Sequence, residues 1–517
     1  MTFTRRSLLR RGGAAAAGAG LVGALATPAR AAAQSDEARD RKALLVVVPL
    51  VRADYVKAFE NGSGTHTPNL DHLTDRSLRF DRAIPECMPS LPARRTLVTG
   101  VRSYPFRDWT PTEGMPAVPG YNPVRWVQPV MTETMRLGGV RTIYVSDNPI
   151  LAGPRFPDVR RPQGTPPATP SGRTGIREEV IPSIQRATKA TERTFRAGIE
   201  ALREMRRDDS WFLGVDPFDP VDAVQAPLIY IKPGRVERQG IGTMNDRLVE
   251  LSWTRGDEDA VREAYRRHVD AVDDWVGRLM DAVPDDVLVY LLGDVGFALG
   301  EHDYLGRGTP TSHRLSYEVP YLIRHPGGKK SGDSVDWYAS THDVAPTILS
   351  HLGLTIPGKM WGEDLTALFD GVDEEDLADR PFSITASGSL IMVRNDRWLM
   401  VADREQQERR LYDDDENADD DNDDKRYDNV ANDQPGVLSD LSVVALTVAG
   451  GTLPELGPNG AERPPPERSD DDVDDDGIPN DFDAVDNEHP DDDDGPAALR
   501  FDGRDPEDRT RQRSDSP

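Results

Sequence analysis

The chain has 517 residues, of which 37% are apolar and 29% charged, and its formal net charge is −28. This length and apolar content suffice for a large buried core, and the acidic surplus excludes proteins that bind nucleic acid through a basic surface. Only eight residues are lysine, so arginine supplies nearly all the positive charge. This composition favours a surface adapted to high salt. The alternative is an ordinary protein with one acidic tail.

Residues 1–33 have the pattern of a twin-arginine export signal. Arg5 and Arg6 precede a weakly apolar run of Ala and Gly, which ends in a small-residue cleavage site at Ala31. We therefore expect a secreted or cell-surface protein. No run reaches the roughly 20 strongly apolar residues that a membrane span needs, so no span is expected. The single cysteine, Cys87, cannot form an internal disulfide.

Residues 42–371 alternate short apolar runs with helix-like stretches, and two of the runs are ALLVVV and VLVYLL. Continuous apolar runs of this length are typical of strands covered on both faces. The rhythm predicts an α/β fold, a three-layer sandwich with a mostly parallel central sheet. Ligands of such sheets bind where the strands end, so the strand ends are the places to search for a site.

After residue 371 the pattern changes. Residues 372–450 contain ITASGSLIMVRNDRWLMVAD, which alternates like a hairpin, and QPGVLSDLSVVAL, which has a helical pattern. They predict a small C-terminal antiparallel sheet with one helix. Residues 451–517 are rich in Asp, Glu and Pro and contain few core-forming residues, so this acidic tail is expected to be largely disordered.

Four stretches carry a resemblance to a known family: THTPNLDHLTDRSLRFDRAIPE, SLPARRTLVTG, GDVGFALGEHDYLGR and THDVAPTILSHLGL. Together they resemble the sulfatases of the alkaline-phosphatase superfamily. The resemblance covers about residues 42–445. It implies an alkaline-phosphatase-like fold and a sulfuric ester hydrolase, in which carboxylates hold a divalent cation beside a hydroxyl-bearing nucleophile. The cation and nearby Arg or Lys would neutralise charge that develops during hydrolysis.

Two registers compete for the nucleophile of this family, whose signature is Cys-x-Pro-Ser-Arg. Cys87 is followed by Leu91 where the signature needs Arg, whereas Ser90 has Pro92 and Arg94 in place. We therefore assign the nucleophile position to Ser90. In relatives this residue is oxidised to formylglycine or uses its hydroxyl directly. The alternative is that Ser90 only caps the helix that follows.

The positions that match the metal ligands of the family are mostly changed. The first carboxylate slot holds Pro49 and the next holds Leu50, and the second metal segment keeps Asp294 but has an apolar residue after it. Val221 stands where relatives have a histidine. Calcium takes about six to eight oxygen ligands and magnesium six, so we do not expect the family's divalent cation to be held here. The sequence therefore favours a pseudoenzyme.

Three basic side chains remain: Arg94, Arg307 and His302. They predict binding of a sulfated or phosphorylated small molecule or glycan, because guanidinium groups match tetrahedral anions. The alternative is that they pair with Asp294 and nearby carboxylates and only stabilise the fold. A second hypothesis is that the protein is still an active sulfate or phosphate ester hydrolase. It would use Ser90, and its ion site would be rearranged around Asp54, Asp216 or Asp219.

A separate metal signal lies in the tail, in DVDDDGIPNDFD. Oxygen-bearing side chains occur at positions 1, 3, 5, 9 and 12 of this loop, and glycine at position 6. This spacing predicts a calcium loop and resembles the repeats of thrombospondin type 3 and of dockerin-like segments. The candidate ligands are Asp472, Asp474, Asp476, Asn480 and Asp483. A third hypothesis is therefore a calcium-binding cell-surface protein that uses the large domain as a scaffold.

Overall fold

The computed structural model describes residues 41–452, with gaps at 61–64, 89, 117, 166–175, 224–228, 232–254, 300–303, 308–316, 373–376, 378–379, 389, 404–408 and 414–428. Three of the sequence predictions lie outside these residues. They are the export signal, the tail with its calcium loop at Asp472, Asp474, Asp476, Asn480 and Asp483, and the anion-binding role of His302.

An eight-stranded sheet forms the centre of the fold. Its strands are β1 (Lys42–Val48), β2 (Leu78–Ala83), β3 (Arg141–Ser146), β4 (Val159–Arg160), β5 (Trp211–Asp216), β7 (Val287–Gly293), β10 (Tyr321–Arg324) and β11 (Ser334–Ala339). They lie in the order β11-β2-β10-β7-β1-β5-β3-β4. Neighbours are parallel, except that β10 is antiparallel to both β2 and β7. The predicted α/β fold with a mostly parallel sheet is confirmed.

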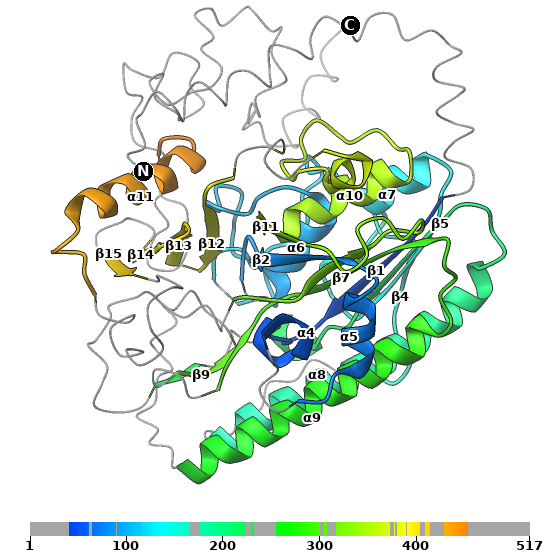
Figure 1. Ribbon diagram of the computed structural model, residues 1–517, viewed down its shortest axis with the longest axis horizontal. Helices are drawn as coiled ribbons and strands as arrows, with labels where there is room; N and C mark the ends of the chain where they lie inside the picture. The colour runs from blue at the N-terminus through cyan, green and yellow to red at the C-terminus, as the bar shows by residue number, and fades with distance from the viewer. Residues whose placement is uncertain are drawn as a thin grey trace, which may run out of the picture.

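Helices cover both faces of this sheet (Figure 1). Alternate residues of a strand point to opposite faces, so Leu45 and Val47 of β1 join one core and Leu44 and Val46 the other. The first core lies under α6 (Ser90–Thr99), α7 (Met131–Leu137) and α10 (Val344–His351). The second lies under α5 (Pro68–Thr74), α8 (Ile176–Met205) and α9 (Arg255–Met280). The three layers of the predicted sandwich are therefore present.

A second, four-stranded antiparallel sheet follows in the chain. It consists of β12 (Ser383–Ser387), β13 (Leu390–Arg394), β14 (Trp398–Asp403) and β15 (Arg409–Asp413), in sequence order. Helix α11 (Pro435–Val448) packs against it through Leu441 and Ala445. This is the predicted small sheet with one helix. Cys87 pairs with Ala386 in an isolated parallel bridge and so joins the two sheets.

Short elements complete the described chain. A three-stranded sheet, in the order β6-β9-β8, is formed by β6 (Ile229–Ile231), β8 (Phe297–Leu299) and β9 (Tyr304–Arg307). The remaining helical turns are η3 (Ala53–Tyr55), α4 (Lys57–Glu60), η4 (Pro220–Ala223), η8 (Thr341–Asp343) and η9 (Leu365–Asp370). Among the described helices, none has both the length and the apolar character that crossing a bilayer requires.

Candidate active site

The candidate site lies at the carboxyl ends of the central strands. Asp216 is the last residue of β5, and Asp294 directly follows β7. Pro49 and Leu50 follow β1, which lies between these two strands. Parallel strands end at the same edge of a sheet, so the two carboxylates are brought together. Helix α6 begins at Ser90 and supplies Arg94 one turn later.

Arg94 joins the two carboxylates. Its Nε donates to Asp216 Oδ1 over 2.7 Å, and its Nη1 donates to Asp294 Oδ2 over 2.6 Å. Nη1 also donates to the carbonyl oxygen of Ser90 (3.1 Å), and Nη2 donates to that of Pro217 (2.8 Å). These bonds use four of the five N–H groups of the guanidinium. The ring of Phe218, with its centroid 5.2 Å from the guanidinium carbon, covers it further.

This cluster is fully withdrawn from water. Arg94 is 1% exposed, Asp216 0% and Asp294 2%. Burial raises the pKa of Asp216 even though Arg94 acts in the opposite direction, whereas the two carboxylates together keep the pKa of Arg94 above its usual value despite its burial. Tyr144 and Ser146 also donate hydroxyl hydrogen bonds to Asp216 Oδ2, over 3.2 and 3.3 Å.

The turn after β1 completes the cluster from the other side. The backbone N–H of Leu50 donates to Asp294 Oδ1 over 2.8 Å, so each oxygen of Asp294 already has a donor. Leu50 adopts a φ of 59°, which is uncommon for a residue with a side chain. Helix α9 holds the turn in place, because Tyr265 donates to the carbonyl of Leu50 (2.6 Å) and His268 Nε2 contacts that of Pro49 (2.7 Å).

These residues do not fit a divalent cation. Pro49 and Leu50 offer no side-chain oxygen, and the oxygens of Asp294 accept from protein donors. The carboxylates of the alternative ion site are paired as well: Asp54 with Arg52 (2.7 Å), and Asp219 with Arg186 (3.0 Å). Within the described part of the chain, no group of three His, Cys, Asp or Glu side chains is placed to hold a metal ion.

The other residues predicted for the site are Ser90, Arg307, His302 and the competing nucleophile Cys87. Ser90 is buried in the first turn of α6, next to Arg94. Arg307 is the last residue of β9, but its side chain, like the whole of His302, is outside what the structure describes. Cys87, the competing nucleophile, is buried, and burial raises the pKa of its thiol well above the usual value. Its thiol therefore remains protonated at neutral pH.

Sequence reasoning missed the residues that support the cluster. Tyr144 and Ser146 lie in the mostly buried strand β3, and the sequence pattern of this strand did not indicate that their hydroxyls would bind Asp216. Tyr265 and His268 lie in α9, where their spacing suits an ordinary packed helix face. Asp216 was considered only for an alternative ion site. Its position at the end of a buried strand was the signal that could have placed it beside Asp294.

Comparison with known proteins identifies a family model and relatives to which this chain is similar. Residues 174–354 match the model of the sulfatase family. The chain is 32% identical over 124 residues to an ulvan-active sulfatase of Formosa agariphila, and the match covers 23% of this chain and 24% of that protein. It is 22% identical to a multifunctional alkaline phosphatase superfamily protein of Trinickia caryophylli, over 63% of this chain and 76% of that protein.

Solved structures agree with this placement. A 2-O GAG sulfatase superposes with a TM-score of 0.61 at 16% identity, covering 79% of this chain and 92% of its own. The phosphonate monoester hydrolase of Agrobacterium radiobacter gives a TM-score of 0.55 at 21% identity, covering 82% and 100%. The fold is therefore alkaline-phosphatase-like. Residues 174–354 match the sulfatase family, and the chain is similar to sulfatases in sequence and in fold.

Proposed function

We propose that this chain is an exported sulfatase-family protein without ester-hydrolase activity, which acts by binding a sulfated or phosphorylated carbohydrate. The observation that carries the loss of activity is the double ion pair of Arg94 with Asp216 and Asp294. A guanidinium group lies between the carboxylates at the strand ends, where the family resemblance implies a cation. Export is supported by the Arg5-Arg6 signal pattern.

The chemistry of the family gives the reason why a site without the divalent cation does not turn over esters. A bound divalent cation acidifies the attacking hydroxyl and neutralises the ester's charge, and both effects need an open coordination position. A guanidinium fixed by four hydrogen bonds has no such position. Arg94, Asp216 and Asp294 together carry a formal charge of −1, which repels an anionic ester. Ser90 then has no cation beside it to activate its hydroxyl.

The carbohydrate ligand is supported by relatives. One related structure holds its substrate D-glucosamine-2-N,6-O-disulfate, another holds a neocarrahexaose, and the Formosa agariphila relative is named for ulvan. In the present chain Arg94 is committed to two carboxylates. Contacts to such a ligand therefore come from other residues, among which Arg307 and His302 stay candidates.

Hydrolysis assays test the proposal directly. The full-length protein is incubated in high salt with an aryl sulfate and a bis-aryl phosphate, with and without added Ca²⁺ or Mg²⁺, beside the Ser90→Ala variant. We expect wild type and variant to show the same background rate. Turnover that depends on Ser90 would refute the proposal and favour the active ester hydrolase.

Calcium binding in the tail is a separate proposal that rests on the spacing of the loop. We expect full-length protein to retain calcium, and the double substitution Asp474→Asn and Asp476→Asn to remove it. Elemental analysis after gel filtration measures both. Equal calcium in the two proteins would exclude the tail loop as the site, and calcium in neither would remove the calcium-binding hypothesis altogether.

A further inference from the structure

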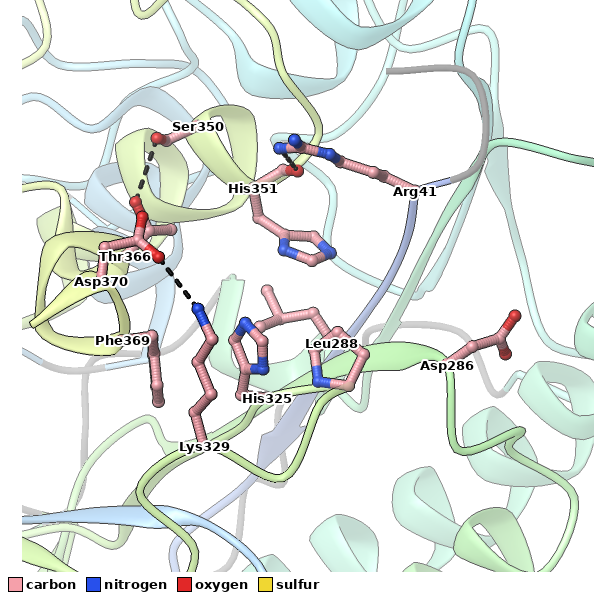
Figure 2. Close-up of a pocket in the computed structure, with 11 residues that line it drawn as sticks. Arg41, Asp286, Leu288, His325, Lys329, Ser350, His351, Thr366, Phe369 and Asp370 are labelled. Carbon is pink, nitrogen blue, oxygen red and sulfur yellow. Dashed lines mark hydrogen bonds and ion pairs between the residues drawn. The ribbon is translucent and has the colours of Figure 1, made fainter. Parts of the chain in front are cut away.

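A cavity of 390 Å³ opens at the edge of the central sheet opposite the candidate active site. It lies beside Arg41, directly before β1, and Asp286, directly before β7, so it is at the amino ends of the strands whose carboxyl ends meet Arg94. The loop after β10, the end of α10 and η9 form the rest of its wall (Figure 2). Ligands of such sheets usually bind at the opposite, carboxyl ends of the strands.

Two histidines line the cavity: one offers a hydrogen-bond donor and the other an acceptor. The Nδ1 of His325 accepts from the backbone N–H of Gly327 over 2.9 Å, which leaves the ring proton on Nε2 as a donor. His351 Nε2 lies 3.2 Å from the carbonyl of Lys42 and must donate to it, which leaves Nδ1 as an acceptor. Burial lowers the pKa of both rings, that of His351 to about 4, so both are neutral at pH 7.

The rest of the lining adds a cation, hydroxyls and a ring. Lys329 pairs with Asp370 over 3.0 Å at the rim, where both side chains are about half exposed or more, and such pairs open at little cost. The hydroxyls of Ser350 and Thr366 lie 3.1 Å apart. The rings of His325 and Phe369 pack at 5.0 Å, and Figure 2 shows them on the same side of the opening as Lys329.

We propose that this cavity binds a monosaccharide-sized anion, a sugar sulfate or sugar phosphate. The volume is at the lower end of that of small-ligand sites. Neutral donors and acceptors suit sugar hydroxyls, the His325–Phe369 wall suits the face of a sugar ring, and Lys329 suits the charged ester group. The site does not depend on whether the opposite edge hydrolyses esters.

Calorimetric titration of the full-length protein tests this site with three probes: D-glucose 6-sulfate, D-glucose 6-phosphate and D-glucose. We expect both esters to bind and the uncharged sugar to bind about tenfold more weakly, since it lacks the charged contact. If only one ester binds, the site discriminates sulfate from phosphate. If neither binds at about 10 mM, the proposal is wrong.

Three variants locate the binding. Lys329→Gln removes the cation from an exposed position, and His325→Asn keeps an acceptor near Nδ1 but removes the Nε2 donor. Each should weaken ester binding about tenfold. Lys359→Gln, an exposed lysine outside the cavity, should leave binding unchanged. If His325→Asn does not fold, Lys329→Gln alone decides. Binding that survives the cavity variants lies elsewhere and overturns the proposal, whereas Ser90-dependent turnover bears only on the opposite edge.

Discussion

Arg94 is the residue on which the candidate site depends. Its side chain is buried between two carboxylates that no other cation in the described structure contacts as an ion pair. Removing one partner of a buried ion pair leaves an uncompensated charge in a poorly solvated place, which costs more than the pair itself contributes. The same residue therefore links the carboxyl ends of β5 and β7 to α6.

We predict that Arg94→Met destabilises the protein by about 3–5 kcal/mol, because Asp216 and Asp294 remain buried without their partner. Urea unfolding at pH 7 measures this. The matched control is Arg76→Met, which removes an equally short but exposed pair with Asp285, at 2.7 Å, and should destabilise the protein far less. Equal losses in the two variants would contradict a structural role for the Arg94 cluster.

The turn after β1 shows how one element determines the chemistry of the site. Pro49 and Leu50 carry no ligand atoms, but the backbone N–H of Leu50 donates to Asp294. Tyr265 and His268 of α9 hold the turn through its two backbone carbonyls. A backbone donor and a guanidinium thus satisfy the carboxylates at the strand ends.

Replacing both turn residues should restore ion binding. We predict that the double substitution Pro49→Asp and Leu50→Asp adds two carboxylates at this strand end and makes thermal stability depend on calcium. Asp also tolerates the left-handed backbone of position 50 better than Leu does. Addition of about 5 mM Ca²⁺ should raise the Tm of the variant by a few degrees more than that of the wild type, in which only the proposed tail loop would bind the ion, as scanning calorimetry can show.

A calcium-dependent Tm in the wild type would instead indicate an ion site that the described cluster does not explain. The tail loop is one source of such a shift, so the same titration is repeated with Asp474→Asn and Asp476→Asn in both backgrounds. A shift that survives these tail substitutions in the wild type would contradict our account of the strand ends.

At the level of elements, sequence patterns predicted much of the fold. The runs ALLVVV and VLVYLL became β1 and β7, because an apolar run without alternation can only be buried on both faces. The sequence also shows that Pro49 and Leu50 offer no side-chain oxygen, at the positions where the family resemblance implies metal ligands. The pairing of Arg94 with Asp294 was one of two alternatives from the sequence, but its second partner, Asp216, was not named, since an ion pair between residues 122 positions apart depends on how the strands are ordered in the sheet.

The charge of the whole molecule makes its own prediction. A formal charge of −28 destabilises a compact state through self-repulsion, and salt screens that repulsion. We expect the Tm to rise when KCl is increased from about 0.1 to about 2 M. Thermal unfolding followed by circular dichroism measures this. A Tm that falls over this range would exclude the salt-adapted surface suggested by the composition.

The two edges of the central sheet have different properties. At the carboxyl edge, the Arg94 cluster is closed to water and fully paired. At the amino edge, a cavity displays neutral rings, hydroxyls and an exposed lysine. Strands β1 and β7 begin at the cavity and end at the Arg94 cluster, so the two regions are separated by the full length of these strands. Mutations at one edge should therefore leave the other unaffected, as expected for distant independent sites.

The guanidinium of Arg94 has one property that no bound ion shares, because it is covalently part of the polypeptide. It arrives with every newly made chain in a one-to-one ratio, cannot be stripped by a chelator, and meets no competition from other ions in the medium. At the strand ends, the Arg94 cluster therefore forms together with the fold and draws on no metal supply.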